Sequence, residues 1–171
     1  MRAARCFLAV AIALAALALA LPQVAVARES VNFGGYMPGT IVVKTSERRL
    51  YYVTMDGKAV RYRVGVGKAG KAWTGSAFIT GKFRSPAWSP PADVKRDNPR
   101  LPDVIPGGSP RNPMGVAALT LSGGGQYAIH GTNVPNSVGG FVSYGCFRML
   151  NEDVADLFDR VYVGTPVVVE R

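Results

Sequence analysis

Eight prolines between residues 82 and 113 divide the chain into two parts that can form regular structure. Proline lacks a backbone N–H group and fixes φ, so this density excludes the interior of a helix and a central strand. An ordered loop of such length is uncommon unless it binds something. We therefore expect a long surface excursion that forms one wall of a groove; a disordered insertion without a role is the alternative.

Strand patterns lie on both sides of this excursion. Six segments are rich in β-branched and aromatic residues or alternate apolar with polar ones: residues 40–45, 49–54, 59–66, 116–121, 126–129 and 163–169. Asp56 and Gly57 mark a hairpin between the second and third of them. The predicted fold class is mainly β.

One helical pattern occurs near the end of the chain. Asn151 is a suitable N-cap, acidic residues follow it in the first turn, and apolar residues recur at helical spacing up to Val161. This predicts a short helix before the last strand. Residues 28–39 contain three glycines and a proline with little periodicity, which indicates an irregular leader onto a single domain at residues 40–171.

The first 27 residues have the pattern of a secretory signal peptide. Arg2 and Arg5 precede an apolar stretch that ends near Pro22, and the small residues Ala25 and Ala27 suit a signal peptidase, which predicts cleavage after Ala27. An uncleaved membrane anchor is the alternative, although the apolar run is shorter than the ~20 residues that a bilayer span needs.

The chain is basic, with a formal net charge of +9, and loss of the two arginines of the signal would lower this to +7. Export and the lack of a nucleic-acid-binding motif argue against a nucleic-acid partner. Anionic envelope polymers or membrane surfaces are the expected partners of such a charge. A general contribution to solubility explains the charge equally well.

The number of cysteines limits the roles that a thiol can have in this chain. Only Cys6 and Cys146 are present, and Cys6 lies in the signal, so the exported chain would carry one thiol. A lone cysteine in a secreted protein indicates intermolecular pairing or a reactive thiol. One cysteine with His130, the only histidine, cannot supply the roughly four ligands of a zinc site, so we expect no metal.

His130 precedes Cys146 by sixteen positions in a glycine-rich stretch. A free thiol is mostly protonated at neutral pH, and a neighbouring imidazole that removes its proton is a common means of activation. Gly145 would allow close approach of a substrate, and backbone N–H groups near the nucleophile can bind an oxyanion. An inert buried cysteine with a structural histidine is the alternative.

Three other side chains could bind or support a substrate. Ser143 can donate a hydrogen bond, and Arg148 can bind a carboxylate through two hydrogen bonds, although it could equally be a surface residue. Trp88, in the proline-rich stretch, is a candidate for the groove. The sequence does not decide whether Trp88 and Trp73 line a groove or pack in the core.

A family resemblance joins these residues. The matching positions are His130, Gly131, Thr132, Pro135, Ser137, Gly139, Ser143, Gly145, Cys146, Arg148 and Met149. This pattern resembles the signature of the L,D-transpeptidase catalytic domain, also called the YkuD domain. Residues from about 38, the PAWSPP loop, residues 112–121 and the C-terminal segment are also similar, so the resemblance covers nearly all of the exported chain.

The resemblance implies a β-sandwich-like domain that acts on peptidoglycan without a metal or organic cofactor. Cys146 would attack the third residue of a tetrapeptide stem, release D-alanine, and pass the acyl group to an amine of another stem or of an envelope protein. His130 would be the base and the Gly131 carbonyl would orient it. The resemblance also implies a periplasmic or cell-envelope location and sensitivity to carbapenems.

The remaining roles follow the same resemblance. Tyr144, Gly145 and Cys146 would supply oxyanion-binding N–H groups, whereas Ser143 and Arg148 would support the site or hold substrate. Many family members have a second histidine where this chain has Tyr144, so any side-chain role of that histidine is lost here.

Two other functions fit the same sequence. One is an L,D-carboxypeptidase, exchange or crosslink-cleaving enzyme that uses the same thioester. The other is a noncatalytic, cationic peptidoglycan-binding protein in which the thiol of Cys146 is incidental.

Overall fold

The computed structural model describes residues 28–123 and 126–171. Its strands and helices are, in chain order, β1 (Arg28–Asn32), β2 (Ile41–Lys44), β3 (Arg49–Val53), β4 (Lys58–Arg63), β5 (Val66–Gly67), β6 (Gly75–Arg84), α2 (Ala92–Asp97), β7 (Ala117–Leu121), β8 (Ala128–His130), the 3-10 helix η1 (Pro135–Ser137), β9 (Phe141–Ser143), β10 (Phe147–Arg148), α3 (Asn151–Arg160) and β11 (Pro166–Glu170). The predicted signal peptide, residues 1–27, lies outside the described residues. No helix within those residues is long and apolar enough to cross a membrane.

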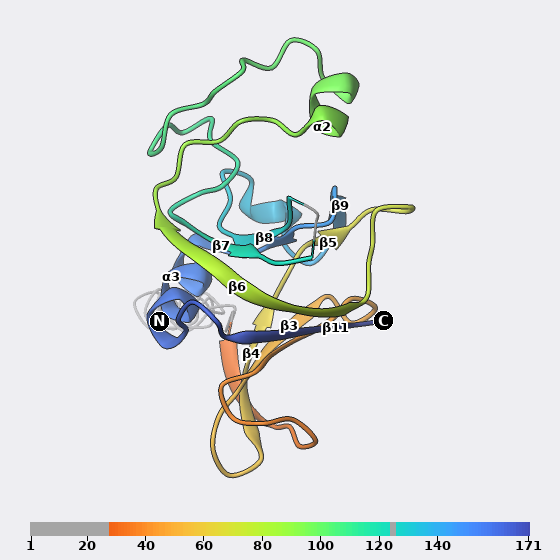
Figure 1. Ribbon diagram of the computed structural model, residues 1–171, viewed down its shortest axis with the longest axis vertical. Coiled ribbons are helices and arrows are strands. Elements are labelled where there is room, and N and C mark those ends of the chain that lie inside the picture. The colour runs from red at the N-terminus through yellow and green to blue at the C-terminus, as the bar shows by residue number, and fades with distance from the viewer. Residues whose placement is uncertain (1–27, 124–125) are drawn as a thin grey trace, which may run out of the picture.

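One curled sheet forms most of the molecule. Nine strands pair in the order β1-β4-β3-β2-β11-β6-β7-β8-β10, and β5 and β9 form a small second sheet. The long strand β6 pairs with β11 through its first half and with β7 through its second, with an irregularity between Ile79 and Gly81. β6 therefore joins the two halves of the curled sheet (Figure 1). The predicted mainly β, sandwich-like fold with a short helix before the last strand is confirmed.

The main core lies inside the curled sheet. Ile79, Leu119, Ile129 and Phe147 are buried there, and Leu157 of α3 joins them as that helix packs on β7 and β8. Burial of each such side chain stabilises the fold by about 2 kcal/mol relative to exposure. β8, which ends at His130, and β10, which directly follows Cys146, are thus fixed by the core of the domain.

The expected irregular leader is wrong over its first five residues. Residues 28–32 form β1, an edge strand that pairs antiparallel with β4 from Arg28 opposite Tyr62 to Asn32 opposite Lys58. The glycines and proline that suggested irregular structure lie after Asn32. β1 has mostly exposed side chains, so its sequence lacks the apolar alternation by which the other strands were predicted.

The predicted N-cap role of Asn151 is also wrong. α3 begins at Asn151, and Leu150 occupies the N-cap position without a side-chain hydrogen bond. The Oδ1 atom of Asn151 instead accepts a hydrogen bond from the N–H group of Thr132 at 3.0 Å and lies 3.4 Å from that of Val116. The side chain therefore binds neighbouring loops rather than its own helix.

The proline-rich excursion has a defined path. We call residues 85–116, between β6 and β7, the proline-rich arm; residues 82–84, expected to belong to it, are the end of β6. The six-residue helix α2 fits between Pro91 and Pro99. A backbone bridge between Trp88 and Ile105 closes the base of the arm. Figure 1 shows the arm and α2 at the opposite end of the molecule from the β3–β4 hairpin.

Candidate active site

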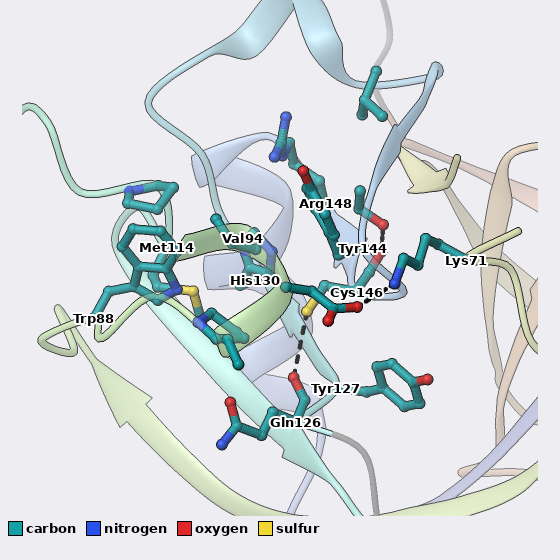
Figure 2. Close-up of a pocket in the computed structure, with 16 residues that line it drawn as sticks. Lys71, Trp88, Val94, Met114, Gln126, Tyr127, His130, Tyr144, Cys146 and Arg148 are labelled. Carbon is teal, nitrogen blue, oxygen red and sulfur yellow. Dashed lines mark hydrogen bonds and ion pairs between the residues drawn. The ribbon is translucent and has the colours of Figure 1, made fainter. Parts of the chain in front are cut away.

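Two parallel strands bring the histidine and the cysteine together. His130 is the last residue of β8, and Cys146 directly precedes β10. The two strands pair with Ile129 opposite Phe147 and His130 opposite Arg148. Neighbouring strands lie about 4.8 Å apart, so this pairing closes the gap of sixteen residues. Figure 2 shows both side chains in one cleft.

His130 is held in a buried environment with a fixed ring. Its side chain is 4% exposed, and Nδ1 lies 2.7 Å from the carbonyl oxygen of Gly131. A carbonyl only accepts hydrogen bonds, so Nδ1 carries the proton and Nε2 is the basic nitrogen. Burial is the main cause that lowers the pKa of His130 to about 4; the Gly131 and Pro113 carbonyls oppose this in part, and the charge of Arg148 adds to it. The imidazole is therefore neutral at pH 7.

The candidate nucleophile Cys146 lies in a short turn, residues 143–146, which Ser143 organises and which we call the nucleophile turn. The Ser143 hydroxyl accepts a hydrogen bond from the Gly145 N–H group and donates one to the Cys146 carbonyl. The Cys146 thiol points to the Gln126 carbonyl at 3.7 Å (Figure 2). Burial raises the pKa of the thiol, so the resting form is SH rather than a thiolate.

A hydrogen bond in this turn limits which of the three predicted backbone N–H groups are free to bind an oxyanion. The Gly145 N–H group already donates to Ser143, so it is occupied in this conformation. The N–H groups of Tyr144 and Cys146 are the remaining candidates among the three.

Two aromatic residues that the sequence did not assign support the same turn. Trp73 donates a hydrogen bond from Nε1 to the Gly145 carbonyl at 2.9 Å, and its ring stacks on Tyr127. A Cβ atom at Gly145 would come within 2.3 Å of the Tyr127 ring, and φ at Gly145 is +122°. Glycine is required there for both reasons. Trp73 is therefore a packing residue of the nucleophile turn, whereas Trp88 lines the cleft.

The cleft has a volume of about 540 Å³ and two different walls. His130, Cys146 and Arg148 come from the strands, and Trp88 comes from the proline-rich arm. Arg148 donates a hydrogen bond to Ser137 at 2.9 Å, and its Nε atom is buried without a partner among the described residues. Burial lowers the pKa of Arg148, but the guanidinium stays charged, and its charge acts on both His130 and Cys146.

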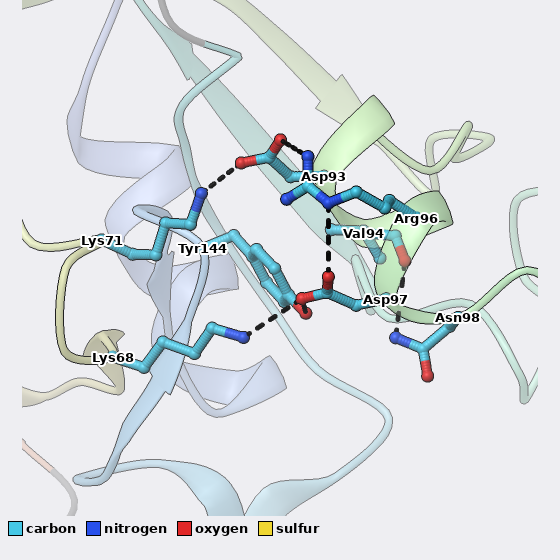
Figure 3. A network of polar contacts seen from close by, with 8 residues as sticks. All are labelled: Lys68, Lys71, Asp93, Val94, Arg96, Asp97, Asn98 and Tyr144. Atoms are coloured by element: carbon cyan, nitrogen blue, oxygen red, sulfur yellow. Dashed lines mark hydrogen bonds and ion pairs between the residues drawn. The ribbon is translucent and has the colours of Figure 1, made fainter.

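A polar network joins α2 to the nucleophile turn (Figure 3). Its members are Lys68, Lys71, Asp93, Arg96, Asp97 and Tyr144. The Tyr144 hydroxyl donates to Asp97, and Lys68 contacts both Asp97 and the face of the Tyr144 ring. Lys71 pairs with Asp93. Hydrogen bonding from Tyr144 and the Lys68 charge hold the pKa of Asp97 below its usual value.

The described ranges contain no group of three or more His, Cys, Asp or Glu side chains placed to hold a metal ion.

Comparison with known proteins agrees with this geometry. Residues 38–169 match the family described as the L,D-transpeptidase catalytic domain. A probable L,D-transpeptidase ErfK/SrfK of Escherichia coli is 37% identical over 158 residues, which cover 87% of this chain and 47% of that protein. The chain thus spans about half the length of the curated relatives it matches.

Solved structures share the fold. An L,D-transpeptidase from Mycobacterium smegmatis has a TM-score of 0.60 at 17% identity, over 77% of this chain and 58% of that one. A Brucella melitensis protein described as a probable carnitine operon oxidoreductase is 40% identical, with a TM-score of 0.56, over 85% of this chain and 93% of that one. The name of the Brucella melitensis protein differs from those of the other matches. We therefore base the family assignment on the match over residues 38–169 and on the Escherichia coli relative.

Proposed function

We propose, because the chain belongs to the L,D-transpeptidase catalytic domain family, that it is a peptidoglycan L,D-transpeptidase with Cys146 as its nucleophile. The observation that carries the proposal is the placement of His130 and Cys146 in one cleft, with the Gly131 carbonyl fixing the imidazole. The donor substrate is a tetrapeptide stem, and the acceptor is an amine of a second stem or of an envelope protein.

Acylation begins from two neutral groups. As the sulfur attacks the carbonyl carbon of the third stem residue, the thiol proton passes to Nε2 of His130 and the carbonyl electrons move to oxygen. Collapse of this tetrahedral intermediate breaks the bond to the terminal D-alanine. The D-alanine nitrogen takes the proton from His130 and leaves as an amine, and a thioester on Cys146 remains.

Transfer reverses these roles. The acceptor amine attacks the thioester and gives a proton to His130, the C–S bond breaks, and the sulfur recovers the proton as a thiol. The N–H groups of Tyr144 and Cys146 bind the oxyanion in both steps. Arg148 and Trp88 bind the stem, since the first supplies a cation for a carboxylate and the second an aromatic surface.

The domain boundaries belong to the same proposal. We infer that residues 1–27 are a signal peptide and that the mature protein begins at Arg28 and works in the periplasm or cell envelope. All residues of β1 that the structure describes, Arg28–Asn32, would remain after this cleavage. The catalytic domain then spans residues 40–171, with β1 as an added edge strand.

Intact-mass spectrometry of the purified mature protein tests the function. The protein is incubated with a disaccharide tetrapeptide and, separately, with a carbapenem. We expect a covalent adduct in each case and none in Cys146→Ser. Crosslinked dimers among the products support transfer, whereas tripeptide alone indicates hydrolysis. A folded, reduced protein that forms no adduct would favour the noncatalytic binding protein.

A further inference from the structure

One peptide unit links the catalytic histidine to the start of α3. The Gly131–Thr132 peptide accepts a hydrogen bond from Nδ1 of His130 at 2.7 Å through its carbonyl. The N–H group of the same peptide donates to Oδ1 of Asn151 at 3.0 Å. A trans peptide is planar, with its C=O and N–H groups pointing in opposite directions. Fixing the N–H group therefore fixes the direction of the carbonyl.

Close packing confines the Asn151 side chain to this contact. A Cβ atom at Gly131 would lie 2.3 Å from Oδ1 of Asn151. A Cβ atom at Gly115 would lie 2.2 Å from Oδ1 and 2.4 Å from the Thr132 nitrogen, between the two bonded atoms. Both positions are glycine, which leaves room for the Asn151 amide to reach the Thr132 N–H group. Asn151 thus connects the start of β7, the end of β8 and the start of α3.

We propose that Asn151 is a positioning residue that keeps His130 in the Nδ1–H tautomer by holding the Gly131 carbonyl toward the ring. Neutral imidazole has two tautomers, and only the one with an unprotonated Nε2 can accept the Cys146 proton through that atom. The inference rests on the proposed function for its catalytic consequence. Its structural part, the control of the tautomer, holds independently of any substrate.

The tautomer of His130 can be measured directly, because the chain contains a single histidine. Long-range ¹H–¹⁵N spectra of protein labelled in histidine report one imidazole and assign its tautomer. We compare the mature protein with Asn151→Ala, which removes the acceptor, and with Asn151→Asp, which keeps an oxygen at the same position. kcat and KM for D-alanine release from a disaccharide tetrapeptide are measured on the same samples.

We expect Asn151→Ala to lose the pure Nδ1–H tautomer and to lower kcat about 10- to 100-fold with little change in KM. Asn151→Asp should restore both the tautomer and most of kcat. Asn133→Ala is the matched control, because Asn133 is exposed on the same loop and its side chain donates a hydrogen bond to the Pro110 carbonyl. It should behave like the parent in both measurements.

Gly115→Ala gives a second test that leaves Asn151 in place. Its Cβ atom would separate Oδ1 from the Thr132 N–H group and also press on the Gly131–Thr132 peptide, at a position with φ of +64°, so the same change of tautomer is expected with a loss of stability. Thermal unfolding identifies which of the two variants, Asn151→Ala or Gly115→Ala, is folded and carries the test. The proposal is wrong if the tautomer is unchanged when the contact is removed, if kcat is unchanged, or if Asn151→Asp restores neither. A parent with the expected tautomer but no turnover would instead refute the proposed function.

Discussion

The two walls of the cleft are held by different forces. The strand wall, formed by the ends of β8 and β10, joins the main core, and backbone hydrogen bonds fix His130 on both sides: Gly131 donates to Ala117 and Met149 donates to His130. The arm wall includes Trp88, Met114 and α2, and α2 has no buried residue. The contacts of α2 with this part of the cleft are polar: Asp97 accepts a hydrogen bond from Tyr144 of the nucleophile turn and pairs with Lys68, which follows β5. The side chains of Lys68 and Asp97 are 40% and 39% exposed.

The difference in stability between the walls suits the proposed chemistry. Exposed ion pairs contribute about 0–1 kcal/mol each, much less than the burial of a single core side chain. Proton transfer requires groups that keep their geometry, and these lie on the strand wall. Under the proposed function, a wall that can move would admit a peptide stem, and we expect the weakly held α2 to be that wall.

The largest expected effect concerns the strand wall. His130→Ala removes the base, and because the resting thiol is protonated, nothing else in the pair can take its proton. Acylation by the tetrapeptide should fall about 10³-fold, as measured by the rate of adduct formation in mass spectrometry. Thermal unfolding is the control for folding. Acylation at the parent rate in a folded variant would exclude His130 as the base.

The next effect concerns the nucleophile turn. Gly145→Ala places a Cβ atom in the Tyr127 ring and forces alanine into φ of +122°. We expect a loss of about 2–4 kcal/mol in the free energy of unfolding, together with slower acylation. Urea denaturation measures the first.

Gly164→Ala is the matched control for strain alone. Gly164 also has positive φ, +96°, but no atom lies within 4 Å of the added Cβ among those of the described residues. It should lose only about 1 kcal/mol. If the two variants lose equal stability, packing of Tyr127 against the turn is not what requires Gly145.

A buried carboxylate behind the strand wall gives the third effect. Asp153 of α3 is 1% exposed and neither carboxylate oxygen has a partner in the described part of the chain. Burial raises its pKa to about 6, above the usual value near 4. The folded state therefore disfavours the charged form, and stability from this group is lost as the pH rises from about 4 through 6.

Asp153→Asn removes that charge. The variant should be more stable than the parent by about 1–2 kcal/mol at pH 8, with a smaller difference at pH 5, where the parent carboxyl is mostly protonated. Urea denaturation at both pH values measures this. A variant that is less stable than the parent at pH 8 would mean that the charge has a favourable partner.

Local patterns predicted most of the fold. β2 and β11 are predicted by their β-branched runs, and β3 and β7 by aromatic or other apolar residues, because strands that enter the core are rich in such side chains. The Asp56-Gly57 hairpin was recognised because its positive φ angles, +61° and +66°, suit those residues. β6 was not predicted: it contains Gly75, Gly81, Lys82 and Arg84, and many of its side chains are exposed.

Local sequence patterns do not predict contacts between segments that are distant in the chain. β9 and β10 have three and two residues, too few to show a period, and form because other strands offer them partners. His130 and Cys146 could be proposed from their residue types alone. The roles of Trp73 and Asn151 depend on contacts with the turn at Gly145 and the loop at Thr132, and their own neighbours in sequence do not indicate these contacts.

The smallest expected effect concerns the contact between the arm wall and Tyr144 of the nucleophile turn. Tyr144→Phe removes the hydroxyl that donates to Asp97 but keeps the ring beneath Lys68. We expect a change below about 1 kcal/mol in the free energy of unfolding. The arm should open more readily, so KM for the tetrapeptide should change about two- to threefold while kcat changes less.

Salt dependence makes this last prediction specific to the arm. Raising the ionic strength from about 0.05 to 0.5 M screens exposed ion pairs and should move KM of the parent toward that of Tyr144→Phe. Asp159→Asn is the matched control, since it breaks the exposed Arg84–Asp159 pair outside the network. If that variant changes KM as much as Tyr144→Phe does, general surface charge rather than the contact between α2 and the nucleophile turn controls access to the cleft.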